Sequence, residues 1–336
     1  MKKIRIAQIG VGHDHAEPTF ESLKVQSDIF EIVGYDPVTE EEMLYPERMR
    51  IFDGYKRMTA EEIMADPSIE AVAIETQEKD LTKYAIMAAK AGKHIQMDKP
   101  GGMKLSDFEE LVAILKEKKL AFQTGYMYRF NPTVIDAIER VKNGELGEIY
   151  SVEAQMSCRY PVSRREWLKC FGKGGMTFFL GCHLIDLVLQ IQGRPEKIIP
   201  LTRPTYIDGV EACDFGMVVF EYKNGVSFIK TTSEERGGYM RRQLVISGSK
   251  GTIEIKPLEQ GCATPRMLNN MVRVCIGDQN DEWGFDGVHS VSEEYNRYDA
   301  MLASFAAIAR GEKENPYTLD YELELYKLVL ECCDML

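Results

Sequence analysis

The chain lacks the features that mark a secreted, membrane or nucleic-acid-binding protein. Its eight cysteines include no CxxC pair and no histidine partner at zinc-ligand spacing, so free thiols in a reducing compartment are expected. The longest apolar run, residues 176–191, is too short to span a membrane and contains His183, Asp186 and Gln190. With 53 acidic against 41 basic residues, the net charge of −12 argues against binding to nucleic acid or to an anionic membrane.

The N-terminus also makes a poor signal peptide, because Arg5, Gln8 and glycines interrupt its apolar residues. We therefore expect a cytoplasmic protein that binds a small molecule. Its 336 residues suffice for two domains of ordinary size, and 44% hydrophobic with 28% charged residues is typical of a globular chain.

The first third of the chain alternates short apolar runs with helical patterns. Strands are expected at residues 4–9, 30–35, 71–75, 94–97 and 121–125, and helices at 15–26, 59–66, 81–91 and 105–119. Thr59 and Glu62 form a capping-box pattern, and Ser106 is expected to cap the last of these helices. This order predicts an α/β domain, a doubly wound parallel (Rossmann) sheet over residues 1–124.

The pattern changes after Asn131-Pro132. A helix to Lys142 precedes strands at 149–159, 198–203, 215–222, 226–232, 244–247 and 252–256, which no helices separate. Lys223-Asn224-Gly225 is a strong hairpin signal. Residues 125–336 are therefore predicted to form an α+β domain with a large, mostly antiparallel open sheet, whose uncovered face is typical of a subunit contact.

The first predicted turn has the composition of a dinucleotide loop. Gly10 permits a tight turn, and Gly12 lets backbone N–H groups approach a pyrophosphate, but His15 stands where the fingerprint has its third glycine. Asp36 ends the second strand 24 positions after Gly12, where it can accept hydrogen bonds from a ribose and would repel the 2′-phosphate of NADP. No arginine follows it, so NAD is favoured over NADP.

His13 and His15 form an HxH pair that could bind a metal ion. The sequence offers no convincing third and fourth ligand, so no metal is expected.

The apolar segment Gly174–Asp186 carries His183 and Asp186 three residues apart, on one face of a predicted helix, with Phe179 one turn earlier on the same stripe. Such a pair is either a set of satisfied polar groups in the core or the wall of a site.

Over nearly its whole length the sequence resembles the Gfo/Idh/MocA oxidoreductases, because it contains their motifs in the same order. These motifs are Gly10-x-Gly12, Asp36, Asp98-Lys99-Pro100, Gly125-Tyr126-x-Tyr128-Arg129-Phe130-Asn131-Pro132, Gly144-Glu145-Leu146-Gly147-Glu148-Ile149, and Gly174-Gly175 through His183-x-x-Asp186. The resemblance implies a Rossmann domain, a sheet domain that mediates dimers or tetramers, a cis Lys99–Pro100 bond, and hydride transfer between a nicotinamide and a sugar, inositol or related polyol.

The resemblance also implies roles for single residues. Lys99 would contact the nicotinamide ribose and the reacting oxygen, and His183 would serve as general acid/base, with Asp186 orienting its imidazole. The cofactor would be held by Gly10, Gly12, His13, Asp36, Thr76, Asp98 and Lys99. Candidate substrate contacts are Tyr128, Arg129, Arg159, Tyr160 and Trp167.

Two positions depart from the family's pattern. Phe179 stands where many members have an aspartate, and the third-strand motif is Thr76-Gln77, with Leu81 in place of a histidine. Two alternatives therefore stay open: a nucleotide-binding sensor that lacks turnover, and a glycosidase that uses NAD in a closed redox cycle.

Overall fold

The computed structural model describes residues 2–277 and 287–336. The chain divides into two compact units, one formed by residues 1–127 and 297–326 and the other by residues 128–296 and 327–336. The expected boundary between residues 124 and 125 lies close to the first crossing point. Residues 297–326, which were expected in the second domain, pack instead with the first unit.

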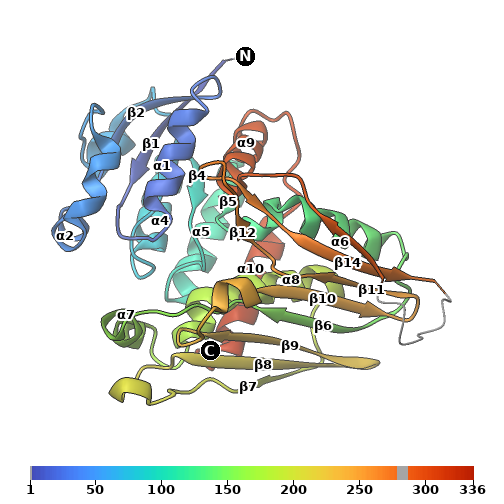
Figure 1. The fold of residues 1–336 in the computed structure, drawn as a ribbon. Coiled ribbons are helices and arrows are strands. Elements are labelled where there is room, and N and C mark those ends of the chain that lie inside the picture. The colour runs from blue at the N-terminus through green and yellow to red at the C-terminus, as the bar shows by residue number, and fades with distance from the viewer. Residues whose placement is uncertain (1, 278–286) are drawn as a thin grey trace. The chain divides into compact units, whose positions relative to one another are not determined.

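The first unit is built on a five-stranded sheet of order β2-β1-β3-β4-β5 (Figure 1). Every neighbouring pair in it is parallel. Its strands are β1 (Ile4–Ile9), β2 (Phe30–Asp36), β3 (Ala71–Ile74), β4 (His94–Met97) and β5 (Phe122–Thr124). The expected doubly wound sheet is confirmed, and each strand lies within two residues of its predicted bounds.

The helices of the first unit are α1 (Ala16–Val25), α2 (Thr39–Leu44), α3 (Ala60–Ala65), α4 (Leu81–Lys90), α5 (Leu105–Lys118), α9 (Arg297–Ala309) and most of α10 (Leu319–Cys332), with a 3-10 segment, η1 (Pro46–Phe52). Four of them, α1, α3, α4 and α5, confirm the predicted helices, whereas α2, α9 and α10 were not predicted. Thr59 and Glu62 form the predicted capping box. The prediction that Ser106 caps α5 was wrong, because Lys104 is the N-cap residue and Ser106 lies within the first turn.

Helix α9 joins the first unit because its apolar face completes that unit's core. Leu302, Phe305 and Ala306 are buried in one cluster with Ile4, Ile6, Val11 and Phe20. The side chain of Gln123 donates to the backbone oxygen of Met301 at 2.9 Å. Burial of about 1.5–3 kcal/mol per large apolar side chain accounts for this placement.

The second unit contains an eight-stranded sheet of order β15-β14-β11-β10-β6-β9-β8-β7. Its strands are β6 (Ile149–Gln155), β7 (Lys197–Pro200), β8 (Phe215–Tyr222), β9 (Gly225–Thr232), β10 (Gln243–Gly248), β11 (Gly251–Ile255), β14 (Met271–Ile276) and β15 (Val288–Val291), and β12 (Gln260–Gly261) pairs separately with β13 (Leu268–Asn269). Only the central β6–β9 pair is parallel among the described strands of this sheet. The predicted large, mostly antiparallel sheet and the hairpin at Lys223-Asn224 are confirmed.

Helices cover one face of this sheet (Figure 1). They include α6 (Pro132–Lys142) and α8 (Cys182–Gln192), and α7 (Val162–Trp167) lies near the end of β6 in sequence. Alternate residues of β8 are buried, as a sheet with one covered face requires. Between α7 and α8 come two short segments, η3 (Leu168–Phe171) and a π-helical turn, η4 (Thr177–Gly181). Among the described residues, no helix is long and apolar enough to cross a bilayer.

Candidate functional site

The glycine-rich turn lies between β1 and α1, at the carboxyl end of the first strand. Gly10 has a φ of +94°, and a Cβ there would lie 2.5 Å from the backbone nitrogen of Thr76. Only glycine therefore fits, both for its backbone conformation and for the approach of the β3 loop. The Gly10 N–H donates to the backbone oxygen of Asp36 at 2.7 Å, which fixes the turn against the end of β2.

A carboxylate on α2 accepts the backbone N–H groups of this turn. Oε2 of Glu41 accepts from Val11 at 3.0 Å and from Gly12 at 2.7 Å, and Oε1 accepts from the N–H of Gln77 at 2.6 Å. The Glu41 side chain is buried, and burial raises its pKa while the three N–H groups act in the opposite direction. The turn therefore forms an anion-binding nest, the arrangement expected for a phosphate group.

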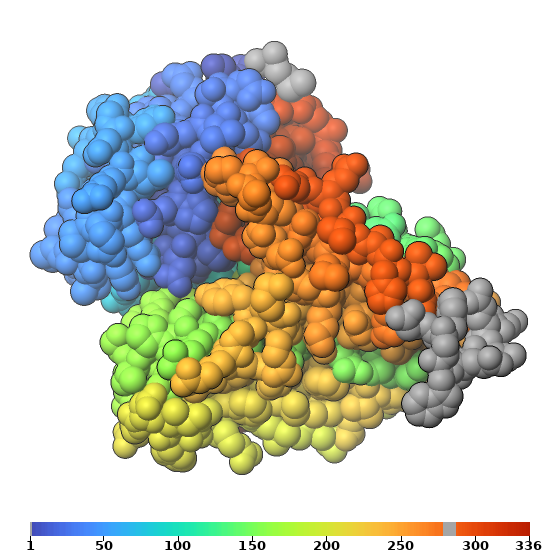
Figure 2. Space-filling model, viewed as in Figure 1, coloured from blue at the N-terminus to red at the C-terminus, as the bar shows by residue number. Residues whose placement is uncertain are grey.

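Arg48 lies in the 3-10 segment η1, which follows α2, and it binds the backbone carbonyl groups of the same turn. Its Nη1 donates to the backbone oxygens of Val11, Gly12 and His13 at 2.9–3.1 Å, and its Nη2 pairs with Asp14 at 2.9 Å. Neither Glu41 nor Arg48 was singled out from the sequence. Their only sequence signal was a run of charged residues after the second strand, which local patterns cannot pair with a turn about 30 residues earlier. The segment around α2, light blue in Figure 2, forms part of the surface.

Asp36 ends β2 as predicted, and its carboxylate organises the loop that follows. Oδ1 accepts from the N–H of Val38 at 2.8 Å, and Oδ2 accepts from the N–H of Ala60 at 2.7 Å. Val38 has a φ of +59°, a left-handed conformation that is unfavourable for a β-branched residue. The strained residue immediately precedes the helix that carries Glu41.

The end of β4 holds Asp98, Lys99 and Pro100 in a buried turn. The Lys99–Pro100 bond is cis, as the resemblance implied, and Lys99 is only 1% exposed. Oδ1 of Asp98 accepts the Lys99 N–H at 2.6 Å, and the Tyr126 hydroxyl donates to the Pro100 oxygen at 3.3 Å. Lys99 therefore lies at the carboxyl end of a parallel strand, where open α/β sheets bind their ligands.

His13, which was predicted to bind the cofactor, packs with buried carboxyl groups beneath the turn. Its Nδ1 lies 3.3 Å from Asp98 Oδ2 and 3.8 Å from Glu75 Oε2. Burial lowers the pKa of His13 well below its usual value. Burial and the adjacent Asp98 raise that of Glu75, whereas His13 and His15 hold the pKa of Asp98 low against the effect of burial.

The second unit contains the predicted histidine in a buried environment. The rings of His183 and Tyr128 meet edge to face, with centroids 5.7 Å apart. Asp186 accepts two hydrogen bonds from Arg129, at 3.0 and 2.9 Å, and one from Gln190 at 2.9 Å. The carboxylate that was expected to orient the imidazole thus forms a buried, bidentate ion pair with another predicted site residue.

Phe179 belongs to the π-helical turn η4, which directly precedes the helix α8 that carries His183. The Phe179 ring stacks on Phe171 at 5.9 Å and meets Trp167 edge to face at 5.2 Å. A π-helix has more residues per turn than an α-helix, so the α-helical spacing behind the predicted common stripe does not apply within residues 177–181. The position of the missing aspartate is thus filled by an aromatic cluster.

The remaining predicted substrate contacts lie in the aromatic cluster or in the loop between β6 and α7. Arg159 is exposed and pairs with Glu234 at 3.5 Å. The guanidinium of Arg164 lies 3.7 Å from the Trp167 ring centroid and 5.9 Å from that of Tyr160. Arg164 was not singled out from the sequence, yet it brings a positive charge to two of the predicted residues. Lys99 belongs to the first unit and His183 to the second, and their convergence on one ligand stays a prediction.

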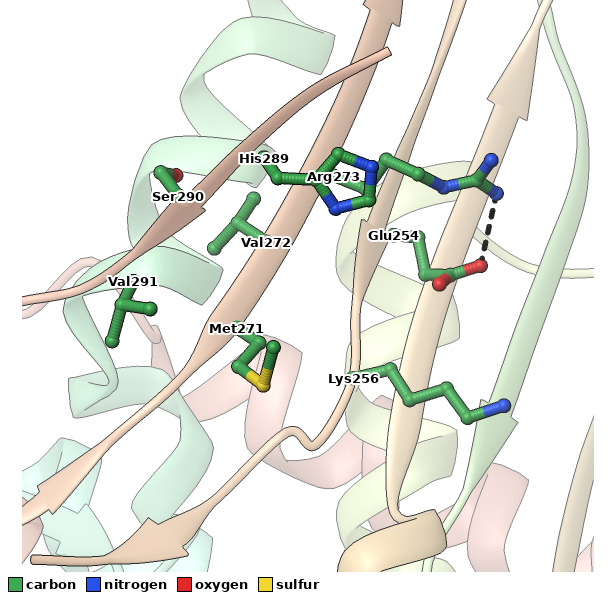
Figure 3. Close-up of a pocket in the computed structure, with 8 residues that line it drawn as sticks. All are labelled: Glu254, Lys256, Met271, Val272, Arg273, His289, Ser290 and Val291. Atoms are coloured by element: carbon green, nitrogen blue, oxygen red, sulfur yellow. Dashed lines mark hydrogen bonds and ion pairs between the residues drawn. The ribbon is translucent and has the colours of Figure 1, made fainter. Parts of the chain in front are cut away.

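A separate hollow of about 310 Å³ lies over the outer strands of the large sheet (Figure 3). It is lined by residues of β11, β14 and β15, among them His289 and an Arg273–Glu254 pair with a 3.1 Å contact. None of the predicted site residues lines it.

Comparison with known proteins relates both units to one family. Residues 4–126 match an oxidoreductase-family model described as an NAD-binding Rossmann fold, and residues 134–254 match the GFO/IDH/MocA C-terminal domain. The oxidoreductase YhhX of Escherichia coli, which is uncharacterized, is 30% identical over 41% of this chain and 39% of its own length.

Longer matches have named activities. Trans-1,2-dihydrobenzene-1,2-diol dehydrogenase of Bos taurus is 26% identical over 81% of this chain and 78% of its own length, and myo-inositol 2-dehydrogenase of Thermotoga maritima is 25% identical over 74% of each. The fold is similar to that of levoglucosan dehydrogenase in complex with NADH and levoglucosan, with a TM-score of 0.77, 19% identity, and coverage of 99% of this chain and 98% of that one. The chain belongs to the Gfo/Idh/MocA family and is an oxidoreductase with an NAD(P)-binding Rossmann domain.

Proposed function

We propose that the protein transfers a hydride between NAD(H) and a sugar, inositol or related polyol. The observation that carries this proposal is the placement of Lys99, a buried lysine at the carboxyl end of β4 in an NAD(P)-binding Rossmann sheet. The named activities of the relatives, on a diol, an inositol and levoglucosan, support the substrate class.

The cofactor site suits a dinucleotide because backbone N–H groups of the turn already donate hydrogen bonds to a carboxylate oxygen. The N–H groups that Glu41 satisfies are those of Val11 and Gly12, which a pyrophosphate would use in its place. Gly10, Gly12, His13, Asp36, Thr76, Asp98 and Lys99 are the residues proposed to hold the cofactor. Asp36 favours NAD, since its carboxylate would repel a 2′-phosphate.

The substrate would be handled by groups from both units. Bound nicotinamide supplies the hydride acceptor or donor. Lys99 would donate a hydrogen bond to the reacting oxygen and stabilise its developing negative charge. His183 would exchange the hydroxyl proton, which suits an imidazole near neutral pH.

The ion pair of Arg129 with Asp186 gives both residues a positioning role. Asp186 lies one turn beyond His183 on α8, and its bonds to Arg129 and Gln190 fix that part of the helix. Tyr128, Arg159, Tyr160 and Trp167 are proposed as further contacts with the polyol, to which aromatic faces and guanidinium groups are suited.

The test is a panel of polyols, inositols and aldoses incubated with NAD⁺ or NADP⁺, with NAD(P)H formation followed by absorbance. We expect turnover with NAD⁺ that is abolished in Lys99→Ala and His183→Ala. Lys104→Ala, which alters an exposed residue outside both proposed sites, is the matched control and should retain activity. Turnover that persists in both site variants would refute the assigned roles.

Two outcomes would favour the alternatives left open by Phe179. Tight NAD binding without turnover of any substrate would indicate a sensor. Release of sugar from a glycoside without net NADH would indicate a closed redox cycle.

We also propose that the open face of the large sheet binds a second copy of this chain. Met271 and Val291, which line the hollow of Figure 3, are 45% and 60% exposed. Light scattering should give the mass of a dimer or tetramer, which Met271→Asp together with Val291→Asp should reduce; a wild-type monomer would refute this interface.

A further inference from the structure

Four side chains that could ligate a metal ion converge where three neighbouring parallel strands end. His13 and His15 follow β1, Glu75 follows β3, and Asp98 follows β4. In the sheet these strands are adjacent in the order β1-β3-β4, which brings together residues up to 85 positions apart in the sequence. We call these four residues the imidazole–carboxylate cluster.

His13, His15 and Asp98 are spaced nearly as in a coordination sphere, with His15 and Asp98 joined by a hydrogen bond, and Glu75 lies next to them. Asp98 Oδ2 lies 2.9 Å from His15 Nδ1 and 3.3 Å from His13 Nδ1, and Glu75 Oε2 lies 3.8 Å from His13 Nδ1. One ligand atom from each of His13, His15 and Asp98 lies within 4.8 Å of the others. Metal bonds of roughly 2.0–2.1 Å in octahedral or tetrahedral geometry place neighbouring ligand atoms about 2.9–3.4 Å apart, so small side-chain shifts would complete the site.

Burial supplies a second, independent observation. Glu75 and Asp98 are fully buried, and neither carboxylate oxygen of Glu75 makes a hydrogen bond of normal geometry with a described residue, although Asp98 and Thr19 lie close enough to shift its pKa. The Nε2 atom of His13 is likewise buried without a hydrogen bond. Leaving a buried carboxyl group unsatisfied is destabilising, and folded proteins seldom retain such a group without a role.

The donor set selects the class of ion. Two imidazoles with two carboxylates suit zinc and other divalent first-row transition metals, whereas magnesium prefers an all-oxygen octahedral site. In the absence of metal, His13 Nδ1 accepts the His15 N–H at 3.1 Å, so ligation through this atom would replace that bond.

We propose that His13, His15, Glu75 and Asp98 bind one divalent transition-metal ion of the zinc type. The ion would tie the glycine-rich turn to the ends of β3 and β4, and so hold the turn that carries the anion-binding nest. The site shares His13 and Asp98 with the residues proposed to hold the cofactor, but the metal proposal does not rest on the proposed function and is tested without nucleotide.

The test uses the full chain, stripped with chelator and dialysed into metal-free buffer without nucleotide. Isothermal titration with Zn²⁺ should give one ion per chain, confirmed by elemental analysis after gel filtration. The melting temperature should rise with Zn²⁺ and not with Mg²⁺, because binding to the native state stabilises it.

Two isosteric variants show whether these residues are the ligands. Glu75→Gln and Asp98→Asn keep the shape of each side chain but remove a charged ligand, and each should weaken Zn²⁺ binding about tenfold or more. His289→Ala removes an exposed histidine elsewhere and should leave the affinity unchanged. Circular dichroism in chelator shows that each variant is folded before titration.

Visible absorption of bound Co²⁺ tests the metal site in the wild-type chain, without any substitution. Co²⁺ bound by imidazole and carboxylate groups at low coordination number should show visible absorption bands more intense than those of the aqueous ion. Absence of stoichiometric Zn²⁺ binding, or equal affinity in Glu75→Gln, Asp98→Asn and the wild type, would overturn the proposal.

Discussion

Replacing Glu41 with glutamine tests whether this carboxylate competes with the dinucleotide for the glycine-rich turn. Its two oxygens accept N–H groups from Val11, Gly12 and Gln77 at 2.6–3.0 Å. An amide offers only one oxygen, so glutamine would lose at least one of these bonds, along with the charge that strengthens all three.

The size of the effect follows from those contacts. Losing one hydrogen bond to a charged group destabilises the Glu41-bound conformation by about 1.5–3 kcal/mol. If this conformation predominates in the free protein, the apparent affinity for a pyrophosphate ligand rises by roughly 10- to 100-fold, since 1.4 kcal/mol corresponds to tenfold.

The assay is calorimetric titration with ADP-ribose and with adenosine. The gain should appear for ADP-ribose, which carries a pyrophosphate, and not for adenosine, which lacks one. Glu40→Gln is the matched control, because it removes the same charge from an exposed neighbour on α2. Equal affinity of Glu41→Gln and Glu40→Gln for ADP-ribose would refute the reasoning.

Three further predictions concern stability, each measured by urea unfolding. Thr59→Ala should cost about 1 kcal/mol by removing the capping box that begins α3, and Thr59→Ser should restore it; no difference between the two would contradict the cap's role. Arg129→Ala should cost about 3–5 kcal/mol, because it leaves Asp186 charged and buried, and a loss below about 1 kcal/mol would contradict this. Burial lowers the pKa of His94, whose Nδ1 accepts the Ala121 N–H at 3.0 Å, so the unfolded chain binds the extra proton and stability falls as the pH drops below about 6.5. His94→Asn keeps an acceptor but cannot titrate, and should make this fall shallower by up to about 1.4 kcal/mol per pH unit; an unchanged slope would be inconsistent with the burial effect.

The parallel half of the fold was predictable because its signals are local. Each strand is a short apolar run, and each helix has a period and end signals that a window of about 15 residues contains. Thr59 with Glu62 fixed the start of α3 in this way. The predicted cap at Ser106 was wrong because serine is found both at the N-cap and one or two positions inside the first turn of a helix, and sequence alone does not separate the two.

Features that depend on distant packing were not predictable. Helix α9 joins the first unit because Phe305 belongs to the same buried cluster as Phe20, nearly 300 positions earlier. The π-helical turn that contains Phe179 was not predicted either, because no local sequence period indicates an extra residue in a turn.

Some residues of the candidate site could be predicted from local sequence, and others could not. Gly10, Asp36 and Lys99 could be identified because each lies directly after a predicted strand. Glu41 lies on a short helix whose folding back onto Val11 and Gly12 is a tertiary event. The sequence offered His13 and His15 as a metal-binding pair without further ligands, and only the sheet order brings Glu75 and Asp98 beside them.

Hydride transfer between a polyol and NAD can be followed with an isotopic label. A polyol that turns over is prepared with deuterium on its carbinol carbon, incubated with the enzyme and NAD⁺, and the cofactor is analysed by mass spectrometry. The account predicts NADH that carries one deuterium at C4 of the nicotinamide, formed by the wild type and not by Lys99→Ala. Oxidation of the polyol without deuterium in the cofactor, or equal transfer in Lys99→Ala, would contradict it.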